Sequence, residues 1–329
     1  MRPLFVFAGQ SNMMGASVLP ATEQIYYKDS AEYLHKPKRF GYSTGTFKKT
    51  GFPSGEFSYK DLHKAYGHLV DVEKKSKLGN YTLNTYFCPS MCNLKSVEEK
   101  KTYPFDYFCE ANALKGVCVA PYIVKGLEEA GYKCAYTHIA KGSVGIDYYI
   151  QGDAANYFEQ KVCDFFMDCE KYFIDDDISE KILVWNQGEN DGANGYEYYI
   201  ESLAKLWTKA KRLGFTRFFI IRVGFWGDER IIDVMRAQED FCREHQDVYM
   251  LTRVASYLEF IEQKEEWFTK CMPEEFSYCR DSFYGYLNHH INEKGFKVIS
   301  KYAVPNIVKI LFEGKEPILE DELIKYMVQ

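Results

Sequence analysis

Short apolar runs of strand length alternate along this chain with stretches of helical pattern, and this alternation limits the possible folds more than any other feature. Alternating strands and helices are typical of a mainly parallel sheet that is covered by helices on both faces. We expect strands at residues 4–8, 134–139, 182–185, 218–223 and 248–251. We expect helices at residues 119–130, 155–172, 195–213, 229–245 and 293–311. The sequence therefore predicts an α/β fold.

Residues at the helix ends support two of these helices. Pro121 stands near the start of the first expected helix and Gly131 follows its end, which is the usual placement of these two residue types. Asn292 is suited to cap the N-terminus of the last expected helix.

The composition excludes several classes of partner. The chain has 329 residues, of which 46% are hydrophobic, and a net charge of only -6, so no strong field favours nucleic acid or an anionic membrane. No run of about 18 apolar residues could cross a bilayer. The apolar run at residues 4–8 is shorter than the roughly 7–15 apolar residues that a signal peptide requires.

The ten cysteines lack paired C-x-x-C spacing. We therefore expect reduced thiols, a cytoplasmic location and no metal at Cys88 and Cys92.

Two stretches interrupt the alternation. Residues 19–115 are rich in Lys, Tyr, Gly and Ser with little periodicity, so they form an insertion after the first strand. Long irregular segments in compact domains are usually functional loops or disordered, and the many aromatic residues here favour order. The insertion is either a region that covers the substrate or an inert surface elaboration. Residues 257–287 form a second irregular stretch that could line the same cleft.

The first strand runs directly into Gly9-Gln10-Ser11-Asn12-Met13 and presents Ser11 at a strand tip, which makes this serine a candidate nucleophile. A serine hydroxyl attacks only when a base removes its proton. His289 and His290 precede the last helix, at the end of the sheet where the sites of α/β proteins gather.

Two further strands end in residues suited to the same chemistry. The run 183–191 ends in amides and carboxylates, which could donate to an oxyanion and orient an imidazolium. It could instead be an ordinary polar loop in which Asn190 or Asp191 caps the following helix. After the strand at 134–139, Gly142 or Ser143 could supply a second oxyanion donor.

Three motifs in this order resemble the SGNH hydrolases, specifically the sialate O-acetylesterase and acetylxylan esterase group, carbohydrate esterase family six. They are residues 9–13, Gln187-Gly188-Glu189, and His290-x-Asn292-x-x-Gly295. The resemblance implies a three-layer α/β/α sandwich with a mainly parallel sheet, as in flavodoxin-like folds. It also implies removal of O-acetyl groups from an acetylated sugar or oligosaccharide without a metal or organic cofactor. It covers one hydrolase domain over residues 1–329, except the insertion.

The resemblance also assigns the site residues. Ser11 matches the nucleophile and the first oxyanion donor through its N–H, Gly142 matches the second donor, and His290 matches the base. We expect the side chain of Gln187 to donate to the oxyanion as well.

The motifs do not assign the acidic partner of the histidine as directly as they assign the other site residues. Many SGNH enzymes carry an Asp three residues before the catalytic His, where this chain has Leu287. Glu189 is the favoured replacement, because a strand tip is more rigid than a loop. Asp281, or a backbone carbonyl, is the alternative.

Two other functions fit the same residues. Because the usual Asp is missing, an inactive carbohydrate-binding protein of the same fold is an alternative interpretation. A lipase or thioesterase of this fold is disfavoured, because the polar, aromatic insertion does not suit a long acyl chain.

Overall fold

The first strand of the chain, β1 (Leu4–Gly9), lies inside a six-stranded sheet of order β3-β5-β1-β6-β7-β8. Every residue of β1 is buried, because neighbouring strands cover both its edges and helices cover both its faces. All pairings in this sheet are parallel. The computed structural model describes residues 1–14, 17–18, 81–82, 116–117, 119–142, 144–224, 229–258, 291 and 293–322.

The other strands of the sheet are β3 (Tyr81–Thr82), β5 (Ala135–Ala140), β6 (Lys181–Asn186), β7 (Arg217–Ile221) and β8 (Val248–Thr252). A separate antiparallel pair consists of β2 (Ser17–Val18) and β4 (Gly116–Val117). The α-helices are α1 (Ser11–Met14), α6 (Ala120–Glu129), α7 (Asp147–Ile150), α8 (Gly152–Tyr172), α9 (Gly195–Arg212), α10 (Arg230–Glu244), α11 (Val254–Tyr257) and α13 (Glu293–Val308). A 3-10 helix, η5 (Glu189–Asn194), follows β6, and a π-helix, η10 (Lys309–Glu313), follows α13.

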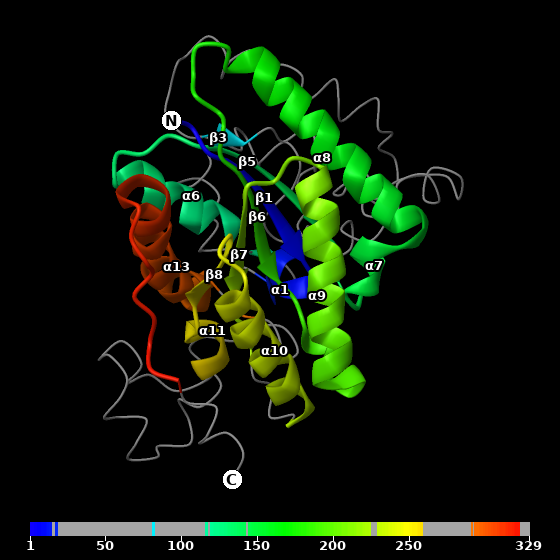
Figure 1. Ribbon diagram of the computed structural model, residues 1–329. Helices are drawn as coiled ribbons and strands as arrows, with labels where there is room; N and C mark the ends of the chain where they lie inside the picture. Colours follow the sequence, from blue (N-terminus) through cyan, green and yellow to red (C-terminus); the bar gives the residue numbers. More distant parts are fainter. Residues whose placement is uncertain are drawn as a thin grey trace.

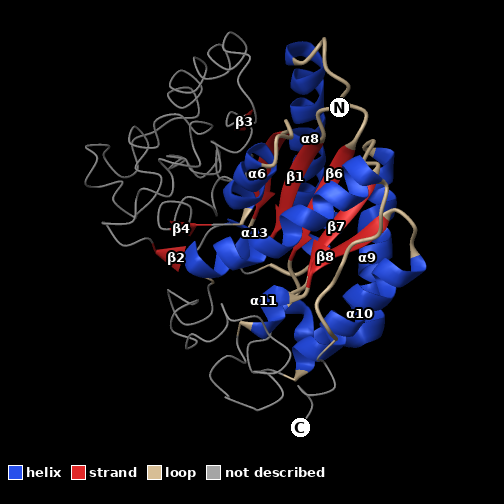
Figure 2. Ribbon diagram, turned by 90° about the vertical axis from the view of Figure 1, so that its left-hand side faces the viewer, coloured by secondary structure: helices blue, strands red, loops and turns tan. Residues whose placement is uncertain are grey.

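The helices form one layer on each face of the sheet. Helices α6 and α13 pack together on one face, whereas α8, α9 and α10 lie on the other, with α7 beside α8 and α9 (Figures 1 and 2). Helix α9 buries Tyr199, Leu203, Leu206 and Ala210, a spacing of three to four residues that places them on one side. The molecule is therefore an α/β/α sandwich with a mainly parallel sheet, as predicted.

The expected strands and long helices are confirmed to within a few residues at each end. Gly131 follows α6 with φ +87°, a backbone conformation that favours glycine, and this agrees with its predicted place after the helix. Two features differ from the expectation. The insertion returns to the main sheet as β3, and the last helix continues into a π-helical turn at 309–313. Asn292, the expected cap, lies outside the described residues.

The described residues leave several other expectations without a structural account. Only β3 of the insertion 19–115 is described, so Cys88 and Cys92 lie outside the described residues. Residues 259–287 of the second irregular stretch also lie outside them. Cys134, Cys163, Cys169 and Cys242 form no disulfide bonds. No helix among the described residues is long and apolar enough to cross a membrane.

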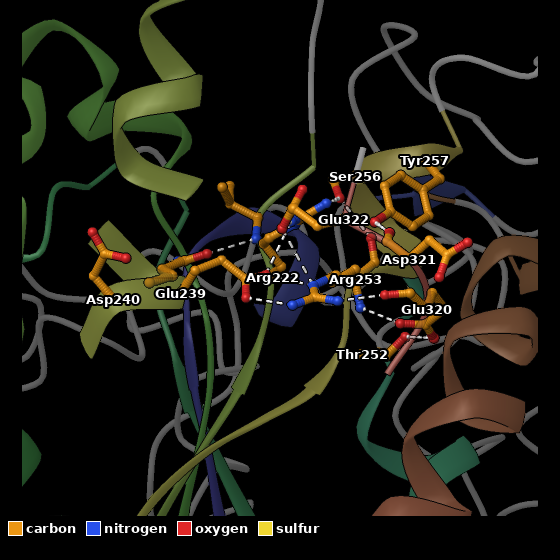
Figure 3. Close-up of polar contacts among 12 residues, drawn as sticks. Arg222, Glu239, Asp240, Thr252, Arg253, Ser256, Tyr257, Glu320, Asp321 and Glu322 are labelled. Atoms are coloured by element: carbon orange, nitrogen blue, oxygen red, sulfur yellow. Dashed lines mark hydrogen bonds and ion pairs between the residues drawn. The ribbon is translucent and has the colours of Figure 1, made fainter. Parts of the chain in front are cut away.

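A cluster of charged residues fixes the C-terminal segment across the ends of β7 and β8. Arg222 is completely buried, and its Nη1 lies 3.0 Å from Glu239 and 2.6 Å from Glu322. Arg253 makes two hydrogen bonds of 2.7 Å to the carboxylate of Glu239. Figure 3 shows the two guanidinium groups between Glu239 on one side and Glu320 on the other. The segment 314–322 is therefore bonded to residues that follow both strands.

Candidate active site

The three segments singled out in the sequence end side by side at the carboxyl edge of the sheet. In the strand register, Gly9 at the end of β1 pairs with Ala140 of β5 on one side and with Asn186 of β6 on the other. Ser11, Gly142 and Gln187 follow these three positions within one or two residues. The parallel topology thus brings together the segments that sequence analysis placed at one edge.

Gly9 permits the close approach of these strands. Its φ of +150° is a value that residues with a side chain rarely adopt, and a Cβ atom there would overlap the carbonyl oxygen of Asn186. The carbonyl oxygen of Gly9 accepts hydrogen bonds from the N–H of Lys141, at 3.1 Å, and from the hydroxyl of Tyr149. The turn that carries Ser11 is therefore bonded to the segment that carries Gly142.

Ser11 is the first residue of α1, and only 6% of its surface is exposed. The neighbouring side chain of Asn12 is almost completely buried and has two partners from distant parts of the chain. Its Nδ2 donates to Oε1 of Glu189 at 3.0 Å, and its Oδ1 accepts from the N–H of Ile291 at 3.0 Å. Ile291 directly follows the predicted base, His290, in the sequence.

Glu189 begins η5, immediately after the β6 loop. Its second carboxyl oxygen, Oε2, is buried and has no hydrogen-bond partner among the described residues. Burial raises the pKa of Glu189 from its ordinary value of 4.5 to about 7, although the hydrogen bond from Asn12 acts in the opposite direction. Its carboxyl group therefore lies beside the serine turn with one oxygen available.

The side chain of Gln187 is completely buried, and its contacts differ from the prediction that it donates to an oxyanion. Its Nε2 lies within hydrogen-bond distance of three acceptors: Oε1 of Gln10 at 3.2 Å, the carbonyl of Val144 at 3.2 Å, and the carboxylate of Asp191. An amide nitrogen has two hydrogens, so these acceptors already exceed its capacity. Gln187 therefore holds the loops together and is not free to donate to a substrate.

Asp191 is buried and bonded to the loop after β5. Its Oδ2 accepts from the N–H of Ile146 at 2.9 Å, and its Oδ1 accepts from Asn194 at 3.2 Å. Burial also raises the pKa of Asp191. Helix α9 has no side-chain hydrogen bond at its N-cap, so neither Asn190 nor Asp191 caps it. The alternative interpretation of this cluster as helix-capping residues is wrong.

Two helix residues that the sequence did not point to, Tyr199 and Gln238, hold the loop after β6 through hydrogen bonds. The hydroxyl of Tyr199 lies 2.8 Å from the carbonyl oxygen of Gln187, to which Nε2 of Gln238 donates at 2.9 Å. Gln238 also accepts from the N–H of Val223 at 3.0 Å. Both residues lie inside amphipathic helices, where their spacing is the same as that of core residues.

Several predicted site residues have no structural account. His290, the alternative acid Asp281 and Leu287 lie outside the described residues, as does His289. Gly142 is described and lies two residues after the end of β5, in the loop where it was predicted. Among the residues that the structure describes, no three His, Cys, Asp or Glu side chains are close enough to form a metal site.

Comparisons with known proteins do not identify a family. No protein-family model matches the chain, and no curated protein matches it. The chain is similar to a solved structure of a protein from Arabidopsis thaliana, with 11% identity and a TM-score of 0.48, over 92% of this chain and 96% of that one. At these values the similarity indicates neither a family nor an activity.

Proposed function

We propose that this chain is a serine esterase that removes O-acetyl groups from carbohydrates through an acetyl-enzyme intermediate. The proposal rests on the resemblance of three short motifs to the carbohydrate esterases. The observation that supports it best is the register of Gly9 with Ala140 and Asn186, because residues that must act on one ester group have to meet at one place. Gly9 and Ala140 meet this condition although 131 positions separate them in the sequence.

In the proposed reaction His290 removes the proton of the Ser11 hydroxyl, and the serine oxygen attacks the acetyl carbonyl carbon. The negative charge on the carbonyl oxygen is stabilised by the backbone N–H groups of Ser11 and Gly142. The intermediate collapses, the sugar leaves with a proton from His290, and Ser11 carries the acetyl group. Water, deprotonated by His290, then releases acetate and restores the serine.

Glu189 is the proposed acid partner of His290. Its buried Oε2 requires a donor, and the N–H of an imidazole supplies one. The imidazolium that forms during the attack then lies against a carboxylate, which stabilises it. Gln187 has a different part from the one expected: its contacts with Gln10 and Val144 fix the loops that carry Ser11 and Gly142.

The substrate class follows from the resemblance, and acetylated sugars or oligosaccharides are the proposed partners. We also propose a cytoplasmic location, which is supported by four cysteines among the described residues that form no disulfide bond. Cell fractionation tests the location, and recovery of the protein only outside the cell would contradict it.

A hydrolysis screen tests the activity. Purified protein is given acetylated xylan fragments, O-acetylated sialic acids, simple acetyl hexoses and the long-chain ester 4-nitrophenyl palmitate. We expect acetate release from at least one sugar and slower cleavage of the palmitate. Preference for the palmitate would indicate a lipase or thioesterase. Glycan binding in calorimetry with no hydrolysis of any ester would indicate a binding protein.

A further inference from the structure

The side chain of Asn12 connects two parts of the site that the sequence separates by 177 and 279 positions, respectively, from Asn12. It is 1% exposed, so both of its hydrogen bonds are made away from solvent. Because Oδ1 accepts from the N–H of Ile291, the amide is fixed in one orientation, and Nδ2 must face Glu189. A single amide group therefore contacts the residue after the proposed base and the proposed acid.

The contact also distinguishes the two oxygens of the Glu189 carboxylate. Oε1 accepts from Asn12, whereas Oε2 is buried without a partner among the described residues. A carboxylate fixed through one oxygen can turn only little about its bonds, so the direction of the other oxygen is fixed as well. This is how a neighbouring hydrogen bond orients a group that acts in the reaction.

We propose that Asn12 is a positioning residue, which holds the Glu189 carboxylate in one fixed direction relative to the backbone at Ile291, the residue after His290 in the sequence. Asn12 does not touch the substrate in this proposal. It acts through Glu189, and the inference therefore rests on the esterase function proposed above.

A double-mutant cycle on kcat tests this role. Asn12→Leu keeps a similar side-chain shape and removes both hydrogen bonds, and Asn12→Ala is a second variant without steric overlap. We expect either variant to lower kcat for 4-nitrophenyl acetate on the order of 10²-fold with little change in KM, the effect of a misplaced catalytic group. In a Glu189→Gln background the same substitution should change kcat less than threefold, because residues that act as a unit are not additive.

A buried asparagine elsewhere provides the matched control. Asn306 is 2% exposed and bonded to Leu251 and Ile318, far along the chain from the serine turn. Asn306→Leu should lower the thermal unfolding midpoint and leave kcat nearly unchanged. Equal factors for Asn12→Leu with and without Glu189, or a kcat unchanged in both Asn12 variants, would overturn the positioning role. A wild-type protein that is inactive on all esters would instead overturn the esterase function, and the role with it.

Discussion

Glu189 should make the folded protein less stable at alkaline pH, because its carboxyl group is buried and one of its oxygens has no hydrogen-bond partner among the described residues. Burial raises its pKa from 4.5 to about 7. A group whose pKa is higher in the folded state stabilises the protein at low pH, and this contribution is lost as the pH rises through the folded-state value. Since one pKa unit corresponds to about 1.4 kcal/mol, the loss between pH 4.5 and pH 8.5 is about 3 kcal/mol.

Glu189→Gln removes the titration and keeps the oxygen that accepts from Asn12. The variant should be more stable than wild type by about 3 kcal/mol at pH 8.5 and equal to it in stability below pH 4.5. At pH 8.5 an ordinary histidine is neutral, so no imidazolium charge stabilises the Glu189 carboxylate. Urea unfolding followed by tryptophan fluorescence at pH 4, 6.5 and 8.5 measures the free energy of unfolding.

The control is Glu201→Gln on α9, since this side chain is 69% exposed and its carboxylate is solvated. We expect its effect to stay within about 0.5 kcal/mol at each pH. If the effect of Glu189→Gln does not change with pH, the carboxyl group is not buried in the way described. A variant that is less stable than wild type at pH 8.5 would show instead that a hydrogen-bond donor to Oε2 outweighs the cost of burying the carboxylate.

Three further predictions concern other parts of the molecule. Glu239→Gln should lower the free energy of unfolding by about 3–5 kcal/mol, because it removes one charged partner of the buried Arg222. Glu322→Gln should lower it by only about 1 kcal/mol, because that carboxylate is 38% exposed. Burial raises the pKa of Glu239, but Arg253 and Arg222 lower it by more, so the net pKa lies below its ordinary value of 4.5. The urea midpoints of wild type and Glu239→Gln should therefore converge as the pH falls below 4.5. Equal losses of stability in Glu239→Gln and Glu322→Gln would contradict the argument from burial. Gly9→Ala should lower the thermal midpoint and esterase activity more than Gly131→Ala, whose added Cβ meets nothing within 4 Å; similar losses would show that contact with Asn186 is unimportant. Glu189→Gln should lower kcat on the order of 10⁴-fold and Asp281→Asn should not, and the reverse result in the same assay would make Asp281 the acid.

The sheet was predictable because its longer strands are short, mainly apolar runs between helical patterns, and the clearest of them, Leu4 to Ala8, is apolar and buried throughout. The meeting of three loops at one edge was predictable for the same reason, since parallel strands end together. Strand β3 was not, because two residues within an irregular stretch carry no recognisable pattern.

The contacts within the site depend on which distant residues meet, and sequence patterns do not contain this information. Tyr149 reaches the carbonyl of Gly9 across 140 positions, and Tyr199 supports Gln187 from within a helix. Gln187 was a reasonable donor by its amide group alone, but three nearby acceptors occupy it. Asn12 stood within a motif already singled out, yet its role appears only when Glu189 and Ile291 lie beside it.

The most direct test of the proposed function is to identify the residue that receives the acetyl group. The protein is mixed with 4-nitrophenyl acetate, quenched in acid within the first turnover and digested for mass spectrometry. We expect one added acetyl group on the peptide that contains Ser11, and nearly complete loss of turnover in Ser11→Ala. Ser300→Ala, at a serine of α13 with the same 6% exposure, should behave as wild type. Wild-type turnover in Ser11→Ala, or acetylation at another residue only, would contradict the account.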